Sequence, residues 1–217
     1  MNPLFEQQLA FFRQHRVVGI LRATSADLAL KAAEAAIMGG IKIIEVPYQA
    51  PGAIRVIADL RRKFGERVLI GGGTITNVEM ADRVIKANAQ FITAPHTNAS
   101  LIEFCCSHNV FAIPGAATPT EIISAVSFGV PLVNIFPVGL LGGAAYVKQL
   151  HELLPEVNFM AGGGITVETL NNYFAAGATV VGIRESLFQP GHIANGNYAG
   201  IAECARDIVR TLQGGGY

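Results

Sequence analysis

The sequence predicts an α/β protein of the (β/α)8 TIM-barrel class, as one domain over residues 1–217 with an extra N-terminal helix. Short apolar runs recur every 20 to 26 residues, with centres near Val18, Ile44, Ile70, Ile92, Ala112, Val133, Phe159 and Val181. Helical patterns fill the intervals, so strand and helix alternate along the chain. The runs are apolar throughout, which is typical of parallel strands covered on both faces. A doubly wound open sheet is the rival fold, but no point of strand-order reversal is evident.

The expected helices have recognisable limits. The first lies near the N-terminus, within residues 2–13, and resembles an ordinary opening helix. Capping residues are expected where a polar side chain precedes a helical pattern, namely at Ser25, Asn77, Thr118 and Thr166. Helix ends are expected where glycine can take the left-handed conformation, at Gly39-Gly40, Gly65, Gly129 and Gly177.

Composition narrows the classes of function. Lys+Arg 16 balances Asp+Glu 16, which disfavours nucleic-acid binding and favours small-molecule chemistry. The opening segment lacks an apolar run long enough for a secretory signal or a membrane span. Three cysteines, with Cys105 next to Cys106, support neither a disulfide framework nor a metal motif. We therefore expect a cytoplasmic protein that binds no membrane.

The active site of such a barrel forms where the strands end at their carboxyl termini. Arg22, Glu45 and Asn134 are the most conspicuous polar residues there. Burial would raise the pKa of Glu45 and suit it to general acid/base catalysis. Alternatively, Glu45 is a structural carboxylate neutralised by Arg22. Arg22 could instead hold a substrate carboxylate or phosphate through its several N–H donors.

Two other strand ends bear on phosphate and metal binding. Gly162-Gly163-Gly164 follows the seventh run and could bind a phosphate through backbone N–H groups, although glycine runs also serve tight turns. After the eighth run Arg184 would attract a phosphate and Glu185 would repel it. His96 has no second ligand at metal-binding spacing. Neither a metal nor another cofactor is therefore expected.

A series of motifs resembles the class I 2-keto-3-deoxy-6-phosphogluconate (KDPG) aldolases and the related 2-keto-3-deoxy-6-phosphogalactonate aldolases. The resemblance covers essentially the whole chain through Gly19–Arg22, Gly39–Ile41, Glu45, Gly71–Thr74, Ala94-Pro95-His96, Pro114-Gly115, Thr118–Glu121, Phe136-Pro137 and Gly163–Ile165. It implies a homotrimer that cleaves a 2-keto-3-deoxy sugar acid phosphate to pyruvate and a three-carbon aldehyde phosphate. The stretch Glu45–Pro51 looks more like the phosphogalactonate branch.

The resemblance assigns roles at matching positions. Glu45 corresponds to the proton-shuttling glutamate, Arg22 and Thr74 contact the pyruvate portion, and Gly163 and Gly164 belong to the phosphate site. The other substrate-binding positions expected at the strand ends are Pro95, Phe136, Arg184, Glu185 and Ser186.

The departure from the family pattern lies at Asn134. The family has Lys-x-Phe-Pro where this chain has Asn134-Ile135-Phe136-Pro137, and an amide cannot form the family's Schiff base. Four of the five lysines lie in helical patterns, and Lys42 has the opposite strand parity to Glu45, so it should point out of the barrel. The family's Gly-Ser pair is also replaced by Arg184-Glu185.

Three functions stay open on this basis. The first is an aldolase-family lyase that acts without the usual lysine, with Asn134 and Arg22 assisting a non-covalent enolisation or with a relocated lysine. The second is a non-catalytic barrel that binds a keto acid or sugar phosphate. The third is a different Glu45-dependent enolising enzyme.

Overall fold

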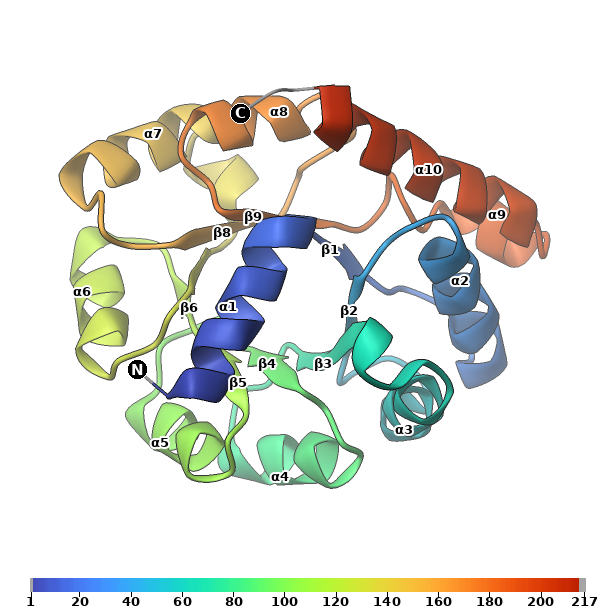
Figure 1. The fold of residues 1–217 in the computed structure, drawn as a ribbon, viewed down its shortest axis with the longest axis horizontal. Helices are drawn as coiled ribbons and strands as arrows, with labels where there is room; N and C mark the ends of the chain where they lie inside the picture. Colours follow the sequence, from blue (N-terminus) through green and yellow to red (C-terminus); the bar gives the residue numbers. More distant parts are fainter. Residues whose placement is uncertain (1, 215–217) are drawn as a thin grey trace.

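A single sheet of parallel strands curves into a barrel surrounded by helices in the computed structural model, which describes residues 2–214 (Figure 1). This confirms the predicted (β/α)8 barrel class. Neighbouring strands follow the order β5-β4-β3-β2-β1-β9-β8-β7-β6. The strands are β1 (Val17–Ile20), β2 (Ile43–Pro47), β3 (Leu69–Gly73), β4 (Phe91–Thr93), β5 (Phe111–Ile113), β6 (Gly115–Ala116), β7 (Val133–Ile135), β8 (Phe159–Gly162) and β9 (Val180–Ile183).

The fifth predicted strand consists of two pieces, which is why the barrel has nine strands within residues 2–214. Pro114 separates β5 from β6. β5 pairs with β4 and β6 pairs with β7, so the two pieces together close the sheet. Proline has no N–H to donate to a strand ladder, but the Pro114 carbonyl still accepts a 2.9 Å bond from the Asn134 N–H.

The helices lie outside the barrel, except for the first (Figure 1). They comprise α1 (Pro3–His15), α2 (Ala26–Met38), α3 (Ala53–Phe64), α4 (Val78–Lys86), α5 (Ala99–Ser107), α6 (Pro119–Ser127), α7 (Ala144–Leu153), α8 (Leu170–Ala175), α9 (Pro190–Ala194) and α10 (Tyr198–Gly214), with 3-10 turns η1 (Gly65–Arg67) and η2 (Val138–Leu141). Over residues 2–214 no helix is both long and apolar enough to cross a membrane.

Most of the predicted helix limits are confirmed. Ser25, Asn77 and Thr118 each accept a hydrogen bond from a backbone N–H in the first turn of their helices. The prediction for Thr166 is wrong, because α8 begins only at Leu170. The Thr166 N–H instead donates to the Thr169 hydroxyl at 3.0 Å, in a turn that precedes the helix.

The glycines predicted to end helices have the expected left-handed backbone, except for the first residue of one pair. Gly65, Gly129 and Gly177 have positive φ angles of 56°, 76° and 97°. In the Gly39-Gly40 pair only Gly40 is left-handed, with φ at 111°. Glycine takes this conformation without the Cβ clash that other residues meet, so these positions end their helices cleanly.

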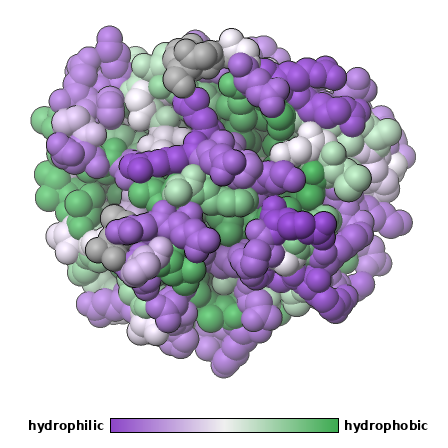
Figure 2. Space-filling view, in the orientation of Figure 1, coloured by the Kyte–Doolittle hydropathy of each residue, from purple (hydrophilic) through white to green (hydrophobic). Residues whose placement is uncertain are grey.

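Helix α1 closes the amino-terminal end of the barrel, where it crosses the barrel axis in Figure 1. Its buried residues Phe5, Leu9 and Phe12 pack with inward-facing strand residues such as Ile43 and Phe111 in one apolar cluster. Figure 2 shows this face filled, with hydrophilic residues over much of it. The N-terminal helix is therefore a plug, a role that its amphipathic sequence alone did not reveal.

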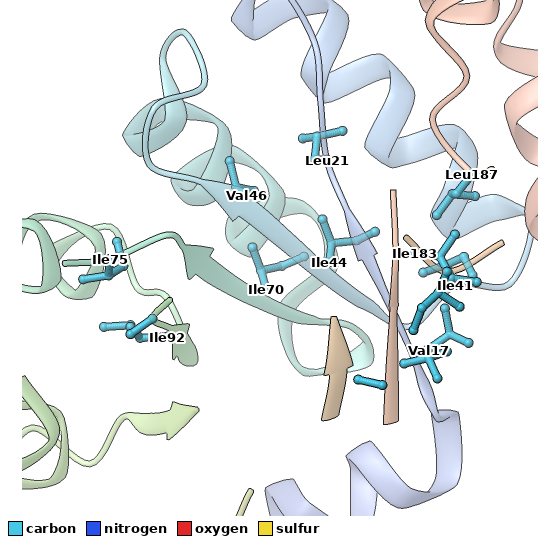
Figure 3. Close-up of a cluster of buried hydrophobic side chains, with 14 of the residues drawn as sticks. Val17, Leu21, Ile41, Ile44, Val46, Ile70, Ile75, Ile92, Ile183 and Leu187 are labelled. Atoms are coloured by element: carbon cyan, nitrogen blue, oxygen red, sulfur yellow. The ribbon is translucent and has the colours of Figure 1, made fainter. Parts of the chain in front are cut away.

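A second apolar cluster lies between the strands and the outer helices, and Figure 3 shows part of it. Along β2, Ile44 and Val46 belong to this outer cluster, whereas Ile43 belongs to the inner one. Side chains alternate between the two faces of a strand. Glu45 has the same parity as Ile43 and therefore faces the barrel interior, one step further toward the carboxyl end.

Candidate active site

A cavity of about 1110 Å³ opens at the carboxyl ends of the strands. Its lining includes every residue that the sequence predicted for the site: Arg22, Glu45, Thr74, Pro95, Asn134, Phe136, Gly163, Gly164, Arg184, Glu185 and Ser186. The fold thus brings together residues that are far apart along the chain. This placement agrees with the prediction of one site, and the role of each residue stays a prediction.

Glu45 is a buried carboxyl in this cavity, with a relative exposure of 6%. Desolvation raises its pKa from 4.5 to about 7, while a side-chain hydrogen bond with Thr93 acts in the opposite direction. Removal from water disfavours the charged form of a carboxyl group. Glu45 can therefore gain and lose a proton near neutral pH.

The alternative in which Arg22 neutralises Glu45 is wrong. The Arg22 Nη1 atom lies 3.7 Å from Glu185 Oε1, and both side chains are largely exposed. Arg184 Nη2 donates to the same Glu185 oxygen at 3.1 Å. No ion pair to Glu45 occurs within residues 2–214. A carboxyl without a cationic partner is free to exchange a proton with a bound ligand.

Asn134, in β7, is the second buried polar residue of the cavity, with a relative exposure of 7%. Its Oδ1 atom has no hydrogen-bond partner within residues 2–214. A buried amide oxygen without a partner costs about 1–3 kcal/mol. A ligand hydroxyl or N–H that donated to Asn134 Oδ1 would recover this free energy, so the amide suits the binding of a hydroxylated molecule.

Two glycines make room for these side chains. A Cβ atom on Gly73 would overlap the Glu45 carboxylate, and one on Gly162 would lie 2.7 Å from Asn134 Oδ1. Glu45 pairs across the sheet with Gly71, two residues before Gly73, and Asn134 pairs with Met160, two residues before Gly162. The side chains of Glu45 and Asn134 thus each extend toward a glycine of the next strand and occupy the space that a Cβ atom would take.

Thr74 has an unusual backbone at the cavity edge. Its φ angle is +56°, a left-handed conformation that β-branched residues rarely adopt. Its carbonyl accepts a 3.4 Å hydrogen bond from Gln49, another residue that lines the cavity. Strain of this kind is often found at binding sites, and it holds the Thr74 side chain in one direction.

The glycine turn after β8 is present, but no helix of two or more turns begins at it. Gly163 and Gly164 have φ angles of 97° and 81° and line the cavity. The helix that follows, α8, begins at Leu170 and has 6 residues. A phosphate at this turn would therefore depend on backbone N–H groups and on the arginines at the rim, with little support from a helix dipole.

None of the cavity-lining residues in the described part of the chain is a lysine. Lys63, Lys86 and Lys148 are exposed and pair with acidic residues on outer helices, and Lys31 lies over the Tyr198 ring. Lys42 acts electrostatically on His15 of the plug helix. Ile44, which has the same strand parity as Lys42, packs in the outer apolar cluster, and this agrees with the expectation that Lys42 points out of the barrel.

Several lining residues escaped the sequence argument, among them Thr93 and Met160. Thr93, at the last position of β4, hydrogen-bonds to Glu45, and the buried Met160 of β8 also lines the cavity. A polar residue that ends an apolar run was the available signal for Thr93. Within residues 2–214 no three His, Cys, Asp or Glu side chains gather in a way that could hold a metal ion.

The fold and the cavity define a TIM-barrel protein with a buried carboxyl in a cavity at the carboxyl ends of its strands. The family model for KDPG and KHG aldolases matches residues 9–204. A 2-dehydro-3-deoxy-phosphogluconate aldolase from Treponema pallidum is 37% identical over 160 residues, 74% of this chain and 76% of the relative. A 2-dehydro-3-deoxy-6-phosphogalactonate aldolase from Escherichia coli is 30% identical over 176 residues, 81% and 85% of the two chains.

Solved structures agree with these sequences. A KDPG aldolase from Legionella pneumophila, with pyruvate captured as a covalent carbinolamine intermediate, has a TM-score of 0.86 at 27% identity and covers 92% of this chain and 97% of its own. A structure described as native KDPGal has a TM-score of 0.84 at 28% identity, with 92% and 95% covered. The chain belongs to the KDPG and KHG aldolase family.

Proposed function

We propose that this chain is an aldolase-type lyase that acts on a 2-keto-3-deoxy sugar acid without forming an imine. The observation that carries the proposal is Glu45, a buried carboxyl with a pKa of about 7 that faces a large cavity and has no cationic partner among residues 2–214. Family membership supports the lyase class. The cavity, which lacks a lysine within the described residues, supports the non-covalent route.

The mechanism assigns one role to each polar group. The ionised Glu45 takes the proton from the C4 hydroxyl of the substrate as the C3–C4 bond breaks and releases the aldehyde. The electron pair of that bond forms the C2=C3 double bond while the carbonyl π pair moves to O2, which gives the enolate of pyruvate. The enolate then takes at C3 the proton that Glu45 holds. The Asn134 amide can donate an N–H to O2, because rotation about its last bond exchanges its donor and acceptor ends. Arg22 would bind the carboxylate.

A hydrogen-bonded carbonyl withdraws electrons less strongly than a protonated imine. We therefore expect slower turnover than in an enzyme that uses a Schiff base. The closest physical precedent is an enolising site that combines a carboxyl base with neutral hydrogen-bond donors.

Exchange of the pyruvate methyl protons tests the proposal, because it needs only the proton-transfer half of the reaction. In deuterium oxide, NMR should show catalysed exchange by the unmodified protein and a loss of about 100-fold or more in Glu45→Gln. Glu203→Gln, an exposed change on α10, is the matched control and should keep the full rate. Exchange that is equal in Glu45→Gln and in the unmodified protein would refute the proposal.

Borohydride trapping separates the covalent from the non-covalent route. With pyruvate and borohydride, intact mass should show no adduct on the unmodified protein and an adduct on Asn134→Lys. An adduct on the unmodified protein would mean that one of its own lysines forms an imine.

A non-catalytic barrel that binds a hydroxylated keto acid is the second candidate, favoured by the unpartnered Oδ1 of Asn134, which a ligand hydroxyl could satisfy. Pyruvate binding without any methyl exchange would support it in place of the lyase. The homotrimer and the cytoplasmic location that were expected from the sequence stay predictions. A designed cage built by fusing symmetric oligomeric domains contains a similar chain, with a TM-score of 0.84, which is compatible with an oligomer.

A further inference from the structure

The rim of the cavity carries a compact charge cluster on two neighbouring strand ends. Arg22 follows β1, Arg184 and Glu185 follow β9, and these strands pair directly. Glu185 Oε1 lies 3.7 Å from Arg22 Nη1 and 3.1 Å from Arg184 Nη2. All three side chains line the cavity and are more than half exposed. Glu185 therefore lies between Arg22 and Arg184, the two cations that an anionic ligand would approach.

The charges of this cluster suit one carboxylate. Two arginines and one glutamate leave a net charge of +1, which the single carboxylate of a 2-keto acid neutralises. A phosphate ester brings a further charge of about −1.5 to −2 at neutral pH. No cavity-lining lysine within the described residues balances that charge, and Glu185 opposes it.

Helix dipoles near the rim offer little compensation. The helices that follow β8 and β9, α8 and α9, have 6 and 5 residues and begin at Leu170 and Pro190. Neither begins at a cavity-lining residue, because the lining after these strands ends at Thr166 and Ser186. An exposed ion pair of this kind also adds little to folding stability, so its main consequence is for the ligand.

We propose that Glu185 is a specificity-determining residue, through which the cavity selects a 2-keto acid with an uncharged, hydroxylated tail over the corresponding phosphate ester. This inference rests on the proposed function, since it takes the cavity to be the site of a 2-keto acid. With the carboxylate bound to Arg22, the uncharged hydroxyls of the tail can accept from Arg184 and donate to Glu185, whereas a phosphate offers the glutamate only repulsion.

Calorimetric titration with 2-keto-3-deoxygluconate and its 6-phosphate tests the inference. The unmodified protein should bind the unphosphorylated acid about tenfold or more tightly than the ester at low salt. Glu185→Gln should reduce this ratio about tenfold, through tighter binding of the ester. Glu152→Gln, which removes an equally exposed carboxylate on α7, should leave the ratio unchanged. Raised salt should weaken the discrimination, because it screens exposed charges.

The outcomes separate the two proposals. If the ester binds as tightly as the acid, and Glu185→Gln does not alter the ratio, the specificity inference is wrong while the proposed function stands. If neither ligand nor pyruvate binds to the unmodified protein, the proposed function fails and the specificity inference fails with it. Displacement of the bound acid by millimolar inorganic phosphate would also contradict the inference, because it would show a working phosphate site.

Discussion

The two ends of the barrel are built from the same strands but have opposite properties. At the amino end, Phe12 of α1 has no exposed surface, and its ring lies 5.3 Å from those of Phe91 and Phe111. At the carboxyl end, Glu45 and Asn134 are buried polar groups beside an open cavity. β2 contributes Ile43 to the first region and Glu45 to the second. A shift of two positions along one strand therefore changes a residue from a packing role to a chemical one.

This contrast teaches that stability and function are separated along the barrel axis. The plugged end gains free energy from dry apolar contacts, at about 25 cal/mol per Å² of buried surface. At the open end, a desolvated carboxyl and an amide oxygen without a partner lower the free energy of unfolding. Substitutions at the closed end should consequently lower the free energy of unfolding, whereas removal of a desolvated or strained group at the open end should raise it.

Phe12→Ala should have the largest effect on stability. The substitution removes a fully buried ring, and the free energy of unfolding should fall by about 3–5 kcal/mol. Pyruvate binding to the folded variant should stay the same, because the ring is at the closed end. Urea unfolding and calorimetry measure the two effects. Phe11→Ala, which truncates a half-buried neighbour, should cost clearly less. An equal loss in both variants would show that α1 is not a specific plug.

Glu45→Gln should change how stability depends on pH. Between pH 4.5 and about 7 folded Glu45 holds a proton that the unfolded chain has lost, so its contribution to stability declines as pH rises through this window. The full penalty is present above pH 7 and amounts to roughly 3 kcal/mol. In urea unfolding from pH 4.5 to 8, the glutamine variant should gain about this much relative to the unmodified protein. Parallel curves for the two proteins would contradict a raised pKa at Glu45.

Thr74→Gly should have the smallest effect, a gain in stability that is opposite in sign to the effect of Phe12→Ala. Glycine accepts φ of +56° without strain, but it also makes the unfolded chain more flexible, so the net gain in stability should be roughly 1 kcal/mol. Thermal unfolding measures it. Asn88→Gly is the matched control, since asparagine tolerates the φ of 65° at this position. This substitution should change stability by only a few tenths of a kcal/mol. A loss of stability in Thr74→Gly would mean that its side chain contributes more than the strain costs.

Periodicity was sufficient to predict the barrel, because parallel strands buried on both faces leave a clear apolar signal. The same pattern could not show that Pro114 interrupts one strand, or that α1 closes the barrel, since both depend on contacts between distant segments. The strand ends correctly indicated which residues line the cavity. The alternative that Arg22 pairs with Glu45 failed, because the Arg22 side chain reaches Glu185, which follows the neighbouring strand β9.

The missing Cβ at Gly162 has a consequence for how easily this cavity could change. Asparagine and lysine codons differ only in the third base, so one mutation can place an amine at position 134. Because Gly162 leaves room beside that position, a longer side chain would not have to displace backbone. The chain is thus one base change away from an amine in its cavity. Its asparagine can persist over many generations only if selection removes the lysine variant or if the lysine gives no advantage.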